Sequence, residues 1–162
     1  MLDPSLTTVE ILGLGVAQEV EAFKRYQILA SMVKNPLVRE KFRSLAREEK
    51  AHREMLYSLL QRYTGEPKPP LPKRALRPLR PINADQSIPD ILMSAIDKER
   101  EAQAFYQEAA SRSLDAAGRQ LLLYLASFEE GHERSLRTEY DALTTYPQWF
   151  EFEAADIQLV GP

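Results

Sequence analysis

The chain has 162 residues, of which 44% are hydrophobic and 28% charged, and its formal net charge is -3. These values are typical of one soluble domain with a substantial core, and they exclude a large basic surface, so we expect no nucleic-acid partner. The sequence contains no cysteine, which excludes disulfides, iron–sulfur clusters and cysteine zinc sites, so any metal must be held by oxygen and imidazole ligands.

The amino-terminal segment shows no targeting signal. It reads MLDPSLTTVE and lacks the basic and apolar regions of a signal peptide. The longest apolar run, ILGLGVA at 11–17, is far too short to span a bilayer. We therefore expect a cytoplasmic protein with no membrane partner.

Four stretches repeat apolar or small residues at the three- and four-residue spacing of one helix face. The first predicts a helix over about 8–34, and the second a helix that ends before the turn at Gly65. The third stretch runs through 92–110 and the fourth through 122–143. We expect four long helices.

The connections between these helices predict the topology. Turns near 35 and 115 are short, which favours antiparallel hairpins, whereas residues 64–87 hold six of the eleven prolines and suit an extended crossover. At about 3.1 Å per residue, this crossover can follow a helix roughly 40 Å long. The pattern predicts an all-α, ferritin-like four-helix bundle of two antiparallel hairpins with one long crossover over residues 1–145.

The C-terminal tail, 146–162, is rich in aromatic residues. We expect it to pack on a bundle end or on a partner subunit, because such side chains left in water would form an unusual exposed patch. The aromatic residues concerned are Tyr146, Trp149, Phe150 and Phe152.

The two hairpins are copies of each other in sequence. Shifting the chain by 80 residues aligns 11–56 with 91–136 without a gap, and 15 positions are identical. In this register Glu49-x-x-His52 aligns with Glu129-x-x-His132, and these are the two histidines of the chain. The bundle should therefore have a pseudo-twofold axis.

The repeated Glu-x-x-His spacing suits a metal site, because residues three apart lie on one helix face with their Cβ atoms about 5–6 Å apart. The inward faces carry four carboxylates and two imidazoles: Glu19, Glu49, His52, Glu99, Glu129 and His132. No lysine or arginine falls inward at these levels, and unpaired buried carboxylates are strongly unfavourable. A pair of divalent cations is predicted; the alternative is a metal-free interaction module. Four further glutamates lie off this face, and we expect them to be solvated: Glu21, Glu48, Glu101 and Glu130.

This set resembles the rubrerythrin-like branch of the ferritin-like superfamily, diiron-carboxylate bundles with a lone glutamate on two helices and Glu-x-x-His on two others. The resemblance spans 10–144, and the twin E-x-E-A-x-x-x-Y stretches, 19–26 and 99–106, are similar to the family's first-ligand helices. It implies bridging Glu49 and Glu129, terminal Glu19 and Glu99, and one iron on each of His52 and His132. For Tyr26 and Tyr106, core packing and a hydrogen bond to a ligand carboxylate are both open interpretations.

Two departures from the family pattern bear on function. The family has a further glutamate one turn after the helix-three ligand, where this chain has Ala102, with Glu101 turned to another side. Without cysteine there is also no rubredoxin-like domain in this sequence, so electrons would come from a separate protein. The crossover's basic residues either solvate it or dock an acidic redox partner: Lys68, Lys73, Arg74, Arg77 and Arg80.

The resemblance implies a diiron oxidoreductase that reduces hydrogen peroxide, with dioxygen as the other candidate substrate. The alternative function is a ferroxidase-type protein that binds and buffers iron. We expect two iron ions per chain, with manganese or a mixed pair as the other choices. We also expect a homodimer.

Overall fold

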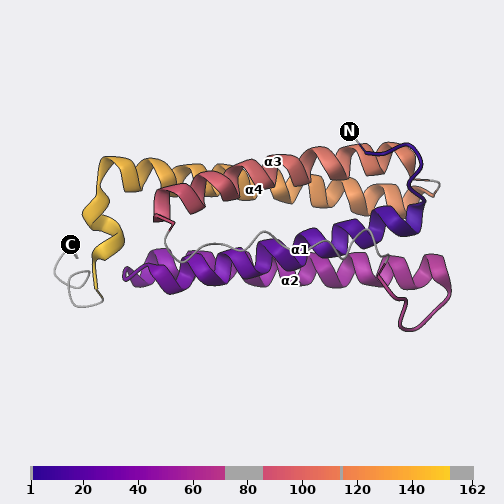
Figure 1. Ribbon diagram of the computed structural model, residues 1–162, viewed down its shortest axis with the longest axis horizontal. Helices are drawn as coiled ribbons and strands as arrows, with labels where there is room; N and C mark the ends of the chain where they lie inside the picture. The colour runs from indigo at the N-terminus through magenta and orange to yellow at the C-terminus, as the bar shows by residue number, and fades with distance from the viewer. Residues whose placement is uncertain (1, 72–85, 114, 154–162) are drawn as a thin grey trace.

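The computed structural model describes residues 2–71, 86–113 and 115–153. In it the chain forms four long helices and a short 3-10 helix: α1 (Thr8–Met32), α2 (Pro36–Thr64), α3 (Ile88–Arg112), α4 (Ala116–Thr145) and η2 (Pro147–Glu151). The predicted all-α four-helix bundle is confirmed (Figure 1).

Side-chain caps explain where the helices begin. Thr7 caps α1 in a reciprocal capping box with Glu10. Asn35 caps α2 by accepting from the backbone of Leu37 and Val38, and a proline occupies the first turn. Gly65 ends α2 in the left-handed conformation, with φ 71°, which a residue without a side chain adopts at little cost. Local capping residues thus determine where α1 begins and where α2 begins and ends.

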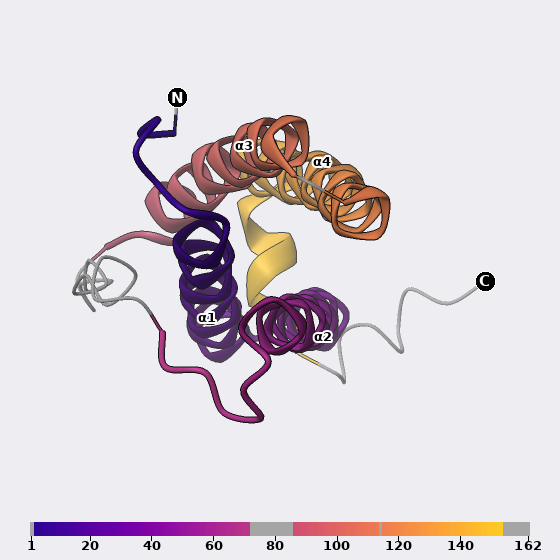
Figure 2. The ribbon, with the colours of Figure 1, turned by 90° about the vertical axis from the view of Figure 1, so that its right-hand side faces the viewer.

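The four helices form two hairpins. α1 packs along α2 and α3 along α4, and the two hairpins lie against each other (Figure 1). Figure 2 shows α1 and α3 on one side of the bundle and α2 and α4 on the other. Most of the predicted crossover, 72–85, lies outside the described residues, with four of its five basic side chains. Within the part of the chain that is described, no helix is both long and apolar enough to cross a membrane.

The bundle has two apolar core clusters, one toward each end. The first includes Leu29, Phe42 and Ile96, and the second includes Leu12 and Leu125, all buried. On every helix the stretch between the two clusters is occupied by a buried polar residue or pair. A polar layer therefore crosses the middle of the bundle, enclosed by apolar packing above and below.

The first residues of the C-terminal tail close one end of the bundle. The backbone nitrogens of Lys34 and Asn35 donate to the Phe150 carbonyl, both at 3.1 Å. The Asn35 side chain donates to the Trp149 carbonyl at 2.7 Å, and the Phe150 ring is buried in the first apolar cluster. Residues 154–162 of the tail lie outside the described part of the structure. The α1–α2 turn is thereby tied to the residues that follow α4.

Candidate metal centre

The polar layer consists of the six side chains singled out from the sequence. α1 and α3 each contribute one glutamate, and α2 and α4 each contribute a glutamate and a histidine one turn apart. None is more than 3% exposed: Glu19, Glu49, His52, Glu99, Glu129 and His132. Four carboxylates and two imidazoles are thus enclosed together, away from bulk water.

The six residues fall into two overlapping groups of four. In each group, one ligand atom from every residue lies within 4.8 Å of the others. One group contains Glu19 and His52 and the other Glu99 and His132, and both contain Glu49 and Glu129. The two shared carboxylates lie between the two halves, as carboxylates that bridge two ions would.

Both histidines turn the same ring nitrogen toward the carboxylates. His52 Nδ1 lies 3.2 Å from Glu49 Oε2 and 3.6 Å from Glu129 Oε1. His132 Nδ1 lies 3.0 Å from Glu49 Oε1 and 3.5 Å from Glu129 Oε2. The two rings are nearly parallel, with centroids 5.6 Å apart. Each half therefore offers one inward imidazole nitrogen beside carboxylate oxygens.

Several polar atoms of this layer have no hydrogen-bond partner among the described residues. They comprise one oxygen of each glutamate and the Nδ1 atom of His132: Glu19 Oε2, Glu49 Oε1, Glu99 Oε2, Glu129 Oε1 and His132 Nδ1. An unsatisfied buried polar atom costs roughly 1–3 kcal/mol, and more when it is charged. Divalent cations would use these atoms as ligands, so the residues present fit a two-metal centre.

Protonation equilibria are strongly perturbed in this layer. Burial raises the pKa of Glu19 to about 8 and that of Glu129 to about 11, because a buried carboxylate loses its hydration. Burial also acts to raise the pKa of Glu49, but the adjacent imidazoles of His132 and His52 outweigh it and lower this pKa to about 2.

The histidines shift in the opposite sense to simple burial. Burial favours the neutral imidazole of His52, but its bonds to Glu19 and Glu49 outweigh this and raise its pKa to about 9. The pKa of His132 is likewise raised, against burial, by its carboxylate neighbours. The carboxylates therefore stabilise the protonated, positively charged imidazoles. Metal ions would compete with these protons for the same carboxylates and imidazoles.

Two buried tyrosines donate hydrogen bonds to the glutamates of α1 and α3. The Tyr26 hydroxyl donates to Glu99 Oε1 at 2.5 Å, and the Tyr106 hydroxyl donates to Glu19 Oε1. Each bond links α1 to α3. The pKa of each tyrosine is raised by burial and by the carboxylate beside it, so both stay protonated donors. Of the two interpretations left open by the sequence, the structure shows the hydrogen bond to a carboxylate of the layer.

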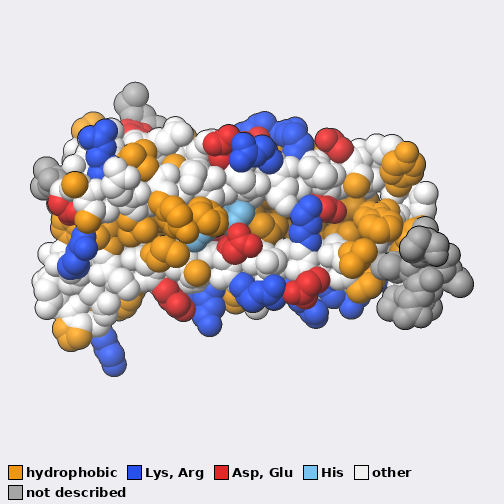
Figure 3. Space-filling model, turned by 180° about the vertical axis from the view of Figure 1, so that it is seen from behind, with side chains coloured by type: hydrophobic (Ala, Val, Ile, Leu, Met, Phe, Trp, Pro, Cys, Tyr) orange, Lys and Arg blue, Asp and Glu red, His pale blue; other side chains and the backbone are white. Residues whose placement is uncertain are grey.

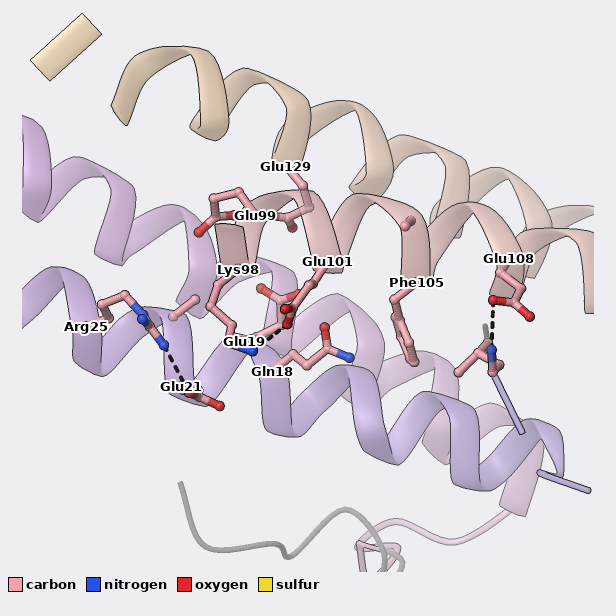
Figure 4. Close-up of a pocket in the computed structure, with 14 residues that line it drawn as sticks. Gln18, Glu19, Glu21, Arg25, Lys98, Glu99, Glu101, Phe105, Glu108 and Glu129 are labelled. Atoms are coloured by element: carbon pink, nitrogen blue, oxygen red, sulfur yellow. Dashed lines mark hydrogen bonds and ion pairs between the residues drawn. The ribbon is translucent and has the colours of Figure 1, made fainter. Parts of the chain in front are cut away.

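A cavity of about 370 Å³ opens onto the layer between α1 and α3 (Figure 4). Glu19, Glu99 and Glu129 line it together with Ala102. Glu101 also lines it, but its side chain is 64% exposed and paired with Lys98. The small Ala102 side chain, where the family pattern has another glutamate, leaves this approach to the carboxylates open.

Two details of the layer's surroundings differ from the sequence prediction. Arg25, for which the sequence gives no sign of burial, is buried in the cavity wall, but it binds Glu21 at 3.0 Å and Ser94 at 2.9 Å rather than a carboxylate of the layer. For Glu48 the prediction of a merely solvated side chain is wrong, because its Oε2 lies 3.1 Å from His132 Nε2. The bond to His132 lowers the pKa of Glu48.

The sequence profile of the rubrerythrin family matches residues 10–140. The chain belongs to the rubrerythrin family. No curated protein matches it. Like the family to which it belongs, this rubrerythrin-family protein has a dinuclear carboxylate site, formed by the two overlapping donor groups.

Solved structures of similar fold extend the comparison for this rubrerythrin-family protein. A hypothetical protein from Pyrococcus furiosus is 29% identical, with a TM-score of 0.77, and the match covers 87% of this chain and 92% of the other. A bacterioferritin from Rhodobacter capsulatus, described with a metal-free dinuclear site and haem iron, is 21% identical with a TM-score of 0.73, covering 96% and 94%. A Desulfovibrio desulfuricans bacterioferritin, described with its diiron site in different catalytic states, is 15% identical with a TM-score of 0.75, covering 92% and 90%. The last two show the ferritin-like fold.

Proposed function

We propose that this protein is a diiron oxidoreductase that reduces hydrogen peroxide to water. The observation that carries the proposal is the pair of donor groups sharing Glu49 and Glu129. Carboxylate oxygens and imidazole nitrogens suit iron or manganese, both of which change oxidation state. Glu49 and Glu129 would be shared by both ions, Glu19 and His52 would help to hold one ion, and Glu99 and His132 would help to hold the other.

The chain's own residues would position the centre and admit the reactant. Tyr26 and Tyr106 fix the carboxylates of Glu99 and Glu19 by hydrogen bonds across the α1–α3 seam. The cavity between the same two helices leads to these carboxylates and is large enough for a molecule of two oxygen atoms. Apolar clusters above and below the layer exclude water from the two ends of the bundle.

The electron balance requires a partner. Reduction of hydrogen peroxide to two water molecules consumes two electrons and two protons, and two ferrous ions held by these residues would be able to supply one electron each. The chain has no cysteine with which to bind an iron–sulfur or rubredoxin-type centre. In this proposal a separate electron-transfer protein would restore the ferrous state, and dioxygen is the second candidate oxidant.

A ferroxidase-type, iron-buffering protein is the alternative function. The acidic lining of the α1–α3 cavity favours it, because Glu21, Glu101 and Glu108 stand along a path that could admit cations. An enzyme of this kind keeps two irons per chain, whereas a storage protein accumulates many.

Stopped-flow absorbance on iron-loaded, reduced protein would distinguish these functions. The protein is mixed with hydrogen peroxide or with dioxygen, and iron per chain is measured before and after repeated additions of ferrous iron. The proposal predicts two irons per chain and faster oxidation by peroxide than by dioxygen. Uptake of many irons per chain would support buffering, and faster oxidation by dioxygen would contradict peroxide as the preferred substrate.

A further inference from the structure

The repeat that builds the two halves of the centre is broken on the outer side of the two histidines. The shift of 80 residues that aligns the hairpins places Ser44 opposite Tyr124 and Glu48 opposite Phe128. All four belong to the α2–α4 side of the bundle. The two halves thus share their inward residues but differ in what contacts the far edge of each imidazole.

On one side, a carboxylate holds the histidine. His132 Nε2 lies 3.1 Å from Glu48 Oε2, and Ser44 Oγ donates to the other oxygen of Glu48 at 3.3 Å. A carboxylate can only accept, so the Nε2 atom carries a hydrogen, and Nδ1 is the nitrogen that can give its lone pair to a metal ion once that ion displaces its proton. Nδ1 is the atom that faces the layer, 3.0 Å from Glu49 Oε1. Glu48 therefore fixes His132 in the tautomer and orientation that a metal ligand needs.

On the other side, an aromatic pair takes the place of the carboxylate. The Phe128 ring packs edge-on against His52, with centroids 5.1 Å apart and planes at 79°, and Tyr124 packs on Phe128 at 4.7 Å. In the described part of the chain, no hydrogen bond reaches His52 Nε2. Phe128 restrains the position of the His52 ring but cannot select its tautomer.

These outer residues lie at a groove rather than in the core. A cavity of about 440 Å³ between α2 and α4 is lined by Glu48, Phe128 and His132. Histidine atoms are visible in the seam between the helices on this face (Figure 3). The Glu48 side chain is 40% exposed, so a change there can be made without opening the apolar clusters.

We propose that the two metal positions are unequal and that Glu48 is the positioning residue that makes the His132 half the tighter one. This inference rests on the proposed two-metal centre. A carboxylate that accepts from the outer nitrogen of a ligating histidine fixes the ring and increases its basicity, and removal of such a partner costs about 10- to 100-fold in metal affinity. The ion bound with Glu99 and His132 should thus bind first, and the ion bound with Glu19 and His52 second.

Calorimetric titration of the metal-free protein with Co²⁺ alone measures both steps. Wild type should bind two ions with constants separated by about 10- to 100-fold. Glu48→Ala should weaken the tighter step by a similar factor and leave the weaker step unchanged. Phe128→Glu, which builds the missing carboxylate by the symmetry of the repeat, should strengthen the weaker step. Glu130→Ala is the matched control, because this exposed residue follows a proposed ligand and pairs with Arg134.

The outcomes separate this inference from the function on which it rests. Equal constants in the wild type, or a Glu48→Ala variant that weakens both steps equally or neither, would overturn the proposal. Fewer than two bound ions in the wild type would instead overturn the two-metal centre itself. Circular dichroism melts of the metal-free variants show whether Glu48→Ala remains folded, and we expect a cooperative melt at a temperature modestly below that of the Glu130→Ala control, because the bond to His132 is lost.

Discussion

The stability of the metal-free protein should fall as pH rises from 5 to 7, whereas that of the metal-loaded protein should rise. In this pH range the buried carboxyl groups of the folded protein keep protons that the same groups release in the unfolded chain. The pKa of Glu19 is raised to about 8 and that of Glu129 to about 11, both from an ordinary 4.5. A raised pKa gives stability that is complete below the unfolded value and is lost as pH rises through the folded value.

The slope can be worked from these shifts. Each proton held by the folded but not the unfolded chain changes stability by about 1.4 kcal/mol per pH unit. Glu19 and Glu129 lie in the same layer and influence each other's protonation, so we count only one extra proton on the folded chain as a minimum. The free energy of unfolding should then fall by about 3 kcal/mol between pH 5 and 7. For a chain of this size that corresponds to a fall in melting temperature of roughly 6–12 °C. The raised pKa of His52, about 9, adds loss of the same sign above pH 6.5.

Glu49 contributes in the opposite direction but in another pH range. Its pKa is lowered to about 2, so its contribution is complete above the unfolded value of 4.5 and is lost as pH falls through 2. It leaves the slope between pH 5 and 7 unchanged. Bound metal keeps all the glutamates ionised, and acid then displaces the ions, which reverses the slope.

Thermal melts followed by circular dichroism, with and without Co²⁺, give both profiles. Glu129→Gln should reduce the pH dependence of stability in the metal-free protein by an amount that corresponds to at most one proton. Glu130→Gln should leave this pH dependence unchanged, since that side chain is half exposed. Parallel profiles for the two forms would refute the reasoning, because they would mean that these carboxylates do not share a buried site.

Three further variants test separate parts of the structure. Tyr106→Phe removes a buried donor and should destabilise the protein by about 1–3 kcal/mol in denaturant melts; no change would mean that its carboxylate is satisfied elsewhere. Glu49→Ala and Glu129→Ala should each lose the paired metal site by metal analysis, whereas Glu21→Ala should retain two ions; equal losses would contradict the assignment of inward faces. Phe150→Ala should cost about 3–5 kcal/mol of stability with metal content unchanged, and a smaller cost would show that the tail does not close the bundle.

Much of the fold could be predicted because the sequence encodes it locally. Apolar spacing located the helices, and the caps at Thr7, Asn35 and Gly65 set their limits. α1 ends at Met32 rather than near 34, because Val33 is already extended before the turn. The gathering of the six polar residues in one layer also follows from helix periodicity and the repeat.

The features that the sequence alone does not predict depend on contacts between helices. Glu48 lies about 100° around α2 from Glu49, so periodicity places it off the inward face. Its contact with His132 depends on how close α2 and α4 approach, which no spacing within one helix reveals. The mismatch of Glu48 with Phe128 in the repeat was the available signal. Arg25 is similar, since its burial comes from the α1–α3 seam and its bond to Ser94.

Anomalous diffraction at the iron edge, from crystals of iron-loaded protein, tests the two-metal centre most directly. We expect two peaks per chain inside the polar layer, both in contact with Glu49 and Glu129. One should lie beside Glu19 and His52, and the other beside Glu99 and His132. A single peak, or iron bound only at exposed carboxylates, would contradict it.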